Sequence, residues 1–183
     1  MKAQLIVAFV FLSGCGSTAT IGVGPTFATD GTVRFEVQLA AGPTTYGLDK
    51  AGLGAQLVGG WGALGTRAGQ QVVLGAGVHG ALVADSGPSG HLSVSYLQRE
   101  ADVPSGRVTL YGGAISAGIA GLLGSGPAPM NGGRACINLC KGVSGGSKIY
   151  YLLGGALQPR FFAGGGHARG EVFVPLELNL WEL

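Results

Sequence analysis

Side chains able to do acid–base or nucleophilic chemistry are few and scattered in this chain of 183 residues. His79, His91 and His167 lie far apart, and none has the His-x-x-x-His or His-Glu-x-x-His spacing that brings two ring nitrogens to one metal. We interpret His79, in an apolar segment, as an interior histidine whose hydrogen bonds are satisfied. We expect His91 and His167, at the edges of loops, to be solvated. The histidines therefore indicate no catalytic or metal site.

Two other patterns associated with catalysis or cofactors are equally weak. The Ser-Gly pairs at 86–87 and 144–145 lack the Gly-x-Ser-x-Gly elbow of serine hydrolases. Gly75-x-Gly77-x-x-Gly80 matches a dinucleotide fingerprint in letters only, because Gly is 37 of the 183 residues and no βαβ unit follows. We therefore expect no catalytic residue, no enzyme activity, no cofactor and no metal.

One polar set does have a regular spacing, and it occupies one face of two alternating segments. In 32–40 and 171–181, apolar and polar residues alternate with period two, which predicts strands rather than helices. The polar members are Arg34, Glu36, Gln38, Glu171, Glu177 and Asn179. If both segments flank the first strand of a closed barrel, these side chains share one lumen or one surface. Mutual pairing of buried charges is the favoured interpretation, and a small-solute site near one mouth is the alternative.

The remaining elements follow from alternation and turn residues. Asp30-Gly31 predicts a hairpin between 19–29 and 32–41. Further strands are predicted at 53–64, 71–84, 91–101, 106–123 and 148–162, separated by Gly- and Pro-rich turns and by a long Gly/Pro loop at 124–147. The fold class is therefore all-β: an antiparallel meander closed into a small barrel of about eight strands, which leaves no exposed edge.

The glycine-rich segments 52–65, 75–80 and 112–124 admit a helical alternative. Glycines at short spacings can pack transmembrane helices against each other. β-branched and aromatic residues cluster in the same segments, and helix caps are missing. In a narrow barrel, small residues on one face would instead relieve crowding in the lumen, so strands are favoured.

The amino terminus has the order of an export signal; a signal peptide with an ordinary Cys15 and the start of a transmembrane helix are the alternatives. Met1-Lys2 precedes an apolar run from Leu5 to Leu12, and the run ends in Leu12-Ser13-Gly14-Cys15. This ending resembles the lipobox of bacterial lipoproteins. The resemblance implies that residues 1–14 are a signal peptide and that Cys15 is acylated, with palmitate among its acyl chains. It also implies that 15–183 is a single domain in the cell envelope of a bacterium. Gly16 and Ser17 imply transfer to the outer membrane, because an Asp after the cysteine tends to retain lipoproteins in the inner membrane.

Lipidation of Cys15 leaves Cys136 and Cys140 as a pair. An even number of cysteines in an oxidising compartment favours a disulfide. A metal site is the weaker alternative, because a lone Cys-x-x-x-Cys falls two ligands short.

The composition places the barrel in or against lipid. Charged residues are 11% of the chain, against about 25% in an average soluble domain, and mean hydropathy is positive. Neither face of 106–123 is charged: Tyr111, Ile115, Ile119 and Leu123 share one side. The last strand, with Trp181, resembles the C-terminal strand of outer-membrane barrels, although those usually end in an aromatic residue.

The sequence thus predicts a lipid-anchored outer-membrane β-barrel with a structural or interaction role. The expected partner is membrane lipid, through Cys15 and the barrel exterior. No basic stripe indicates nucleic acid, and protein partners are not indicated. The alternative is a periplasm-facing lipoprotein barrel that binds a small apolar ligand. A lipid-modifying enzyme is a third possibility, for which no residue can be named. In the spanning version, 124–147 falls on the periplasmic side, where such barrels usually have short turns.

Overall fold

The computed structural model describes residues 16–48, 51–63, 71–84, 86–103, 106–127 and 148–182. These residues form β1 (Gly16–Ala28), β2 (Val33–Leu48), β3 (Ala51–Ala63), β4 (Gln71–Leu82), β5 (Ser89–Val103), β6 (Gly106–Pro127), β7 (Lys148–Gly164), β8 (His167–Phe173) and β9 (Leu176–Glu182). Within them, no helix is long and apolar enough to cross a membrane.

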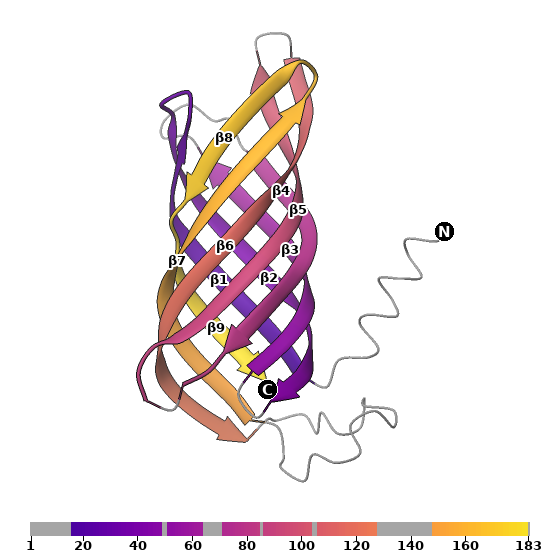
Figure 1. Cartoon of the computed structure of the whole chain (residues 1–183). Coiled ribbons are helices and arrows are strands. Elements are labelled where there is room, and N and C mark those ends of the chain that lie inside the picture. The colour runs from indigo at the N-terminus through magenta and orange to yellow at the C-terminus, as the bar shows by residue number, and fades with distance from the viewer. Residues whose placement is uncertain are drawn as a thin grey trace, which may run out of the picture.

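The strands form one closed antiparallel ring (Figure 1). Each strand from β1 to β7 pairs with the next, and β8 and β9 both pair with β7 on one side and β1 on the other. They are two halves of one closing strand, separated by Val174 and Pro175. The prediction of an all-β meander closed into a barrel of about eight strands is therefore confirmed, and the helical alternative for the glycine-rich segments is wrong.

Several strands are longer than predicted, most of all β2, which was predicted to end at 41 and continues to Leu48. Two further differences concern the closing strand and the β6–β7 connection. The last strand, predicted as one segment at 171–181, starts earlier and is interrupted at Pro175, which has no N–H to donate to a neighbouring strand. The predicted loop at 124–147 begins too early, because β6 continues to Pro127 by pairing with the first residues of β7. Residues 128–147 lie outside the described residues.

The barrel has two distinct ends. β1 begins and β9 finishes at one end, here called the terminal end, and β2, β4 and β6 finish and β3, β5 and β7 begin at this same end. The turns after β1 and β7 lie at the opposite end, here called the turn end (Figure 1). The predicted placement of the β6–β7 connection on the side of the amino terminus follows from this strand order.

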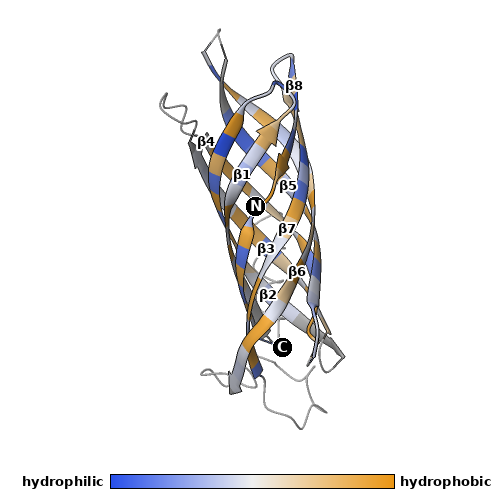
Figure 2. Ribbon diagram, turned by 90° about the vertical axis from the view of Figure 1, so that its left-hand side faces the viewer, coloured by the Kyte–Doolittle hydropathy of each residue, from blue (hydrophilic) through white to orange (hydrophobic). Residues whose placement is uncertain are grey.

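The apolar face of the strands points outward. Val33, Phe35 and Leu39 are 53%, 57% and 55% exposed, whereas Arg34 and Glu36 between them are buried in the lumen. The outer faces of β4, β6, β7 and the closing strand are likewise built from exposed apolar residues. Figure 2 shows hydrophobic and hydrophilic residues alternating along the strands. A barrel in water would need the reverse arrangement, with polar groups outside.

Inward glycines let neighbouring strands approach closely. A Cβ atom on Gly42 would lie 1.9 Å from the carbonyl oxygen of Ala55, and one on Gly112 would lie 1.7 Å from that of Phe161. No side chain fits at such a distance, so these positions require glycine. The crowding relieved here comes from the backbone of the adjacent strand, and not only from side chains in the lumen.

Candidate functional site: a charged network in the lumen

The six polar residues singled out in the sequence are all buried inside the barrel. They come from β2, β8 and β9, and β1 lies between β2 and the closing strand. The structure separates them into a charged group toward the turn end and a smaller group nearer the middle. The first group is Arg34, Glu36, Gln38 and Glu171, and the second is Glu177 and Asn179.

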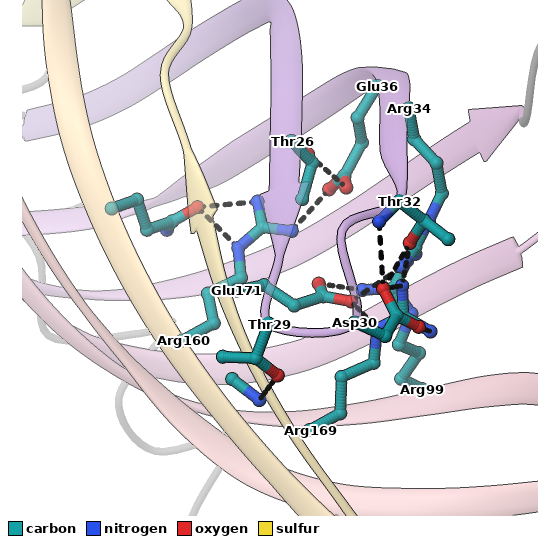
Figure 3. A network of polar contacts seen from close by, with 12 residues as sticks. Thr26, Thr29, Asp30, Thr32, Arg34, Glu36, Arg99, Arg160, Arg169 and Glu171 are labelled. Atoms are coloured by element: carbon teal, nitrogen blue, oxygen red, sulfur yellow. Dashed lines mark hydrogen bonds and ion pairs between the residues drawn. The ribbon is translucent and has the colours of Figure 1, made fainter.

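Glu171 is the centre of the charged network (Figure 3). Its Oε1 accepts a hydrogen bond of 2.8 Å from Arg34 Nη2, and its Oε2 accepts one from Arg99 Nη1. The Nε of Arg169 lies 2.7 Å from Oε1, off the line of a hydrogen bond, so this contact is an ion pair. The side chains of Arg34, Arg99 and Glu171 are fully shielded from solvent.

Glu36 is the centre of a second group of polar contacts, beside that of Glu171. Arg160 Nη1 donates to Glu36 Oε1 over 2.6 Å, and the Thr26 hydroxyl donates to Oε2 over 3.0 Å. The other donors of Arg160 reach Gln38 Oε1, at 2.8 Å, and Gln158 Oε1, at 2.6 and 2.9 Å. Charge-assisted hydrogen bonds of this kind offset part of the cost of burying each ion.

Two aromatic rings complete the shell around the guanidinium groups. Arg160 lies over the ring of Phe173, 4.5 Å from its centroid, and Arg99 lies 5.5 Å from the centroid of Phe162. Both rings are buried in the lumen, so they fill the barrel while offering their negative faces to the cations. The turn-end half of the lumen is packed with paired ions and rings.

The network reaches solvent at the turn end. Arg169 contacts both carboxylate oxygens of Asp30, at 3.0 and 3.2 Å, and donates to the Thr32 hydroxyl. Partial burial alone would raise the pKa of Asp30, but hydrogen bonds from Thr32 and the charges of Arg169 and Arg34 outweigh it and lower the pKa below the ordinary value.

The middle group contains Glu177, Asn179 and a histidine. His91 Nε2 lies 3.3 Å from Glu177 Oε2, and the Thr20 hydroxyl donates to Asn179 Oδ1 over 2.7 Å. The ring of His91 also meets Trp181 edge-on, at 5.9 Å. The expectation that His91 is solvated at a loop edge is therefore wrong: it lies on β5, two residues inside the strand, and points into the lumen.

The other two histidines lie where the sequence indicated, although the hydrogen bonds of His79 are not all satisfied, since its buried Nδ1 has no partner among the described residues. His79 lies inside the barrel, 3.1 Å from the Thr18 hydroxyl through its Nε2. His167 is exposed at the start of β8. Among the described residues, no three His, Cys, Asp or Glu side chains group closely enough to hold a metal ion. Cys15, Cys136 and Cys140 lie outside the described residues.

Sequence reasoning missed half of the network. Arg99, Arg160, Arg169 and Gln158 were not singled out, although each lies in a segment predicted as a strand or directly beside one. The available signal was alternation: Gln158 and Arg160 share a face with Phe162, as Arg34 and Glu36 do on β2. Which strands face each other across the lumen follows only from closure of the ring.

Between the charged network and the terminal end lies a small polar cavity of about 30 Å³. It is lined by Thr20, Gly22, Gln38, Ala40, Gln56, His91, Ser93, Ser116, Gln158 and Glu177. Since a water molecule needs roughly 10–15 Å³ by this measure, the cavity has room for about two waters. A cavity of this size, beside paired and shielded ions, is too small for an organic molecule.

Comparison with known proteins gives similarity of fold only. No family model matches the chain, and no curated protein matches it. The crystal structure of Neisserial surface protein A (NspA) aligns over 91% of this chain and 95% of its own, with a TM-score of 0.49 and 8% identity. The outer membrane enzyme PagL aligns over 90% and 97%, with a TM-score of 0.43 and 10% identity.

A third crystal structure is that of Ail, the attachment invasion locus protein of Yersinia pestis. It aligns over 91% of this chain and 99% of its own, with a TM-score of 0.41 and 8% identity. The chain is an all-β antiparallel ring of eight strands, similar in shape to these small outer-membrane β-barrels.

Proposed function

We propose that this protein is a bilayer-spanning barrel of a bacterial outer membrane, anchored in addition by acylated Cys15, with a structural or interaction role and no catalysis. The observation that carries the proposal is the inversion of polarity across the wall. Large apolar side chains are exposed on the outside, while buried ions and amides fill the inside. Spanning barrels need an apolar outer band and tolerate a polar interior.

The outer surface also has aromatic residues at the turn end, where a spanning barrel would meet the membrane–water interface. Four exposed aromatic residues lie within three residues of the turn-end limit of their strands, as in an interfacial belt: Phe27, Phe35, Trp61 and Phe161. The Arg107–Glu100 pair at the same end, 3.3 Å apart, is exposed. Trp181 does not belong to a belt, since it is buried in the lumen.

The lumen argues against the alternative of a periplasmic barrel that binds an apolar ligand. Such a barrel needs an apolar cavity large enough for its ligand. The cavity here is about 30 Å³ and is lined by amides, hydroxyls, His91 and Glu177. Val33, Phe35 and Leu39, which such a ligand would have to contact from within, point outward.

The same filling argues for a role other than transport. Arg34, Arg99 and Phe162 have essentially no exposure and cross the lumen of the turn-end half. Eight-stranded barrels are normally just wide enough for side chains to fill them. We therefore assign the function to the surface and to the anchored position of the barrel. In this arrangement Cys15, directly before β1, places the terminal end at the periplasmic face.

The test separates the barrel from the anchor. The natural chain is compared with a version in which residues 1–15 are replaced by a secretory signal without a lipobox cysteine. We expect radioactive palmitate to label the natural chain only. Both versions should stay in outer membranes after an alkaline, high-salt wash, and both should shift in gel mobility on heating.

Each component of the proposal can fail separately. Release of the cysteine-free version by the wash would show that the acyl chain alone holds the protein, and would overturn the spanning barrel. Equal palmitate labelling of both versions, or none in either, would overturn the anchor and leave the barrel intact.

A further inference from the structure

The wall of the barrel is interrupted at one level on three adjacent seams. Between β1 and the closing strand, pairing stops at Val23–Leu176 and resumes at Thr26–Phe173 in the same register. Between β7 and the closing strand, it stops at Gly155–Leu176 and resumes at Gln158–Phe173. Since the register is unchanged on both sides, these are local gaps in the ladders and not slips of the strands.

The third gap lies on the other side of β7. Pairing between β6 and β7 runs up to Ala117–Leu157 and resumes at Ala114–Arg160, which leaves Ile115 and Ser116 opposite Pro159 and Gln158. The three gaps therefore adjoin each other across four consecutive strands, β6, β7, the closing strand and β1.

Prolines explain the interruption. Pro25, Pro159 and Pro175 lie in the three gaps, and none has an N–H to donate. Two backbone bonds still cross the gaps on either side of the closing strand. Val174 N donates to Pro25 O over 2.9 Å, and Ala156 N donates to Pro175 O over 3.1 Å. Prolines are rare inside strands with two neighbours because they weaken the ladder.

The polar cavity lies directly behind these gaps. Ser116 and Gln158, two of the unpaired residues between β6 and β7, both line the cavity. Gly22 and Glu177, which pair with each other next to the gap between β1 and the closing strand, line it as well. One other gap of this kind lies between β2 and β3, at Gly42 and Pro43. The three adjoining gaps and the cavity lie between the ion network on the turn-end side and the apolar cluster that contains Leu152 and Trp181 on the terminal side.

Buried polar atoms at this level need a partner that protein atoms do not supply. Glu177 Oε2 and His91 Nδ1 are buried and make no hydrogen bond to the described residues, although Glu177 Oε2 lies 3.3 Å from His91 Nε2. Glu177 is only 6% exposed and borders the cavity. Unsatisfied buried groups next to a polar cavity of this size are normally satisfied by internal water.

We propose that this level is a hydrated waist: the cavity binds about two internal waters on Glu177, His91 and the surrounding amides, and the proline-interrupted wall opens locally to exchange them. The barrel is then two rigid halves joined by a layer of lower local stability. This inference concerns the barrel alone and does not depend on acylation of Cys15.

Cysteine labelling tests the waist at three inward positions of one strand. Ser116, Ala114 and Ala120 on β6 are 5%, 4% and 4% exposed, so static burial does not distinguish them. Each is changed singly to Cys in full-length protein whose three native cysteines are replaced by Ala. The folded barrel is then treated with a small charged methanethiosulfonate, and folding is verified by gel mobility before and after heating.

We expect Ser116→Cys to react about tenfold faster than Ala114→Cys and Ala120→Cys, because opening is concentrated at the waist. Equal rates, or a faster reaction at either flanking position, would overturn the proposal.

A second measurement avoids substitution in the lumen. Leu157 and Val174 are outward residues opposed across the gap, and Leu153 and Leu178 are outward partners in the intact ladder of the same seam. A disulfide between cysteines at 157 and 174 should slow hydrogen exchange of the amides at 115–117, whereas one between 153 and 178 should leave it unchanged. If both bridges had the same effect on exchange, the opening would not be localised, and the waist would be rejected.

Discussion

The two halves of the lumen differ in their content of buried charge, although each contains an apolar cluster; the one toward the turn end is Val58, Val73, Leu97, Leu110, Ala114 and Phe162. Toward the turn end, Glu36 and Glu171 are each surrounded by guanidinium and hydroxyl donors in fixed directions. Toward the terminal end, the filling is an apolar cluster of Ala81, Val83, Ala120, Tyr150, Leu152 and Trp181. The same narrow ring of strands accepts both.

The difference teaches that a closed barrel specifies volume more strictly than polarity. Paired ions are directional, so each member depends on its partners, and the loss of one leaves an uncompensated charge. Apolar side chains depend on shape, and their loss leaves a cavity. The contrast predicts that the charged half responds to changes of charge at constant shape, while the apolar half responds only to changes of volume.

The largest expected effect is in the charged half. Glu171→Gln keeps the shape but removes the carboxylate that faces Arg34, Arg99 and Arg169. We expect a loss of about 3–5 kcal/mol in the free energy of unfolding, measured by denaturant titration of the barrel refolded in lipid. Glu177→Gln on the same closing strand is the matched control, with a smaller loss because the side chain that faces Glu177 is one histidine, His91, and not three arginines. Equal losses in the free energy of unfolding would show that the charged network contributes no more to stability than the Glu177–His91 contact does.

Leu152 tests the apolar half in the same titration. Leu152 is fully buried in the apolar cluster of the terminal end. Leu152→Ala should therefore lower the free energy of unfolding by about 2–5 kcal/mol, through lost burial and a residual cavity. Leu152→Met, which nearly conserves volume, should cost less than about 1.5 kcal/mol. A large loss of stability for the methionine variant would contradict the idea that the apolar half depends on side-chain volume alone.

A third change compares the lumen with the outer wall. Ile115 is 54% exposed on β6, while its neighbour Ala114 faces the lumen. Ile115→Arg should destabilise the barrel in lipid by roughly 2–4 kcal/mol, because the outer band near the bilayer centre excludes charge. Ile115→Leu should be neutral. If the arginine variant were as stable as the leucine variant in lipid vesicles, the outer face would not lie in the bilayer.

The smallest effect is expected at the solvent-exposed rim of the network. Because the pKa of Asp30 is lowered in the folded state, its contribution is complete above its ordinary value of 3.8 and is lost as pH falls through the lower, folded value. Asp30→Asn should therefore cost less than about 1 kcal/mol near neutral pH and nothing in strong acid. Unfolding curves at both pH values check this, and a growing difference at low pH would contradict it.

The alternation of apolar and polar residues was sufficient to predict the strands and the faces they present. Val33, Phe35 and Leu39 share a side with each other, as do Arg34 and Glu36, because side chains in a strand alternate whatever their surroundings. Asp30-Gly31 similarly predicted the first hairpin, and short turns predicted antiparallel neighbours. These are local properties, so one chain segment at a time determines them.

The contents of the lumen were only partly predictable for the opposite reason. Arg99 on β5 is far in sequence from Glu171 on β8, and Arg160 on β7 is far from Glu36 on β2. Only closure of the ring brings each arginine to its carboxylate. His91 was misjudged as a solvated residue because its nearness to a turn in sequence says nothing of the side of the wall to which it points.

What the sequence by itself determined is the all-β class, the number of strands and the segregation of apolar from polar faces. Tertiary structure alone decided which face is outside, which ions pair, and that the prolines of three strands meet at one level beside a polar cavity. The physical reason is that periodicity acts within one strand, whereas curvature and pairing of charges depend on strands distant in sequence that meet only when the barrel closes.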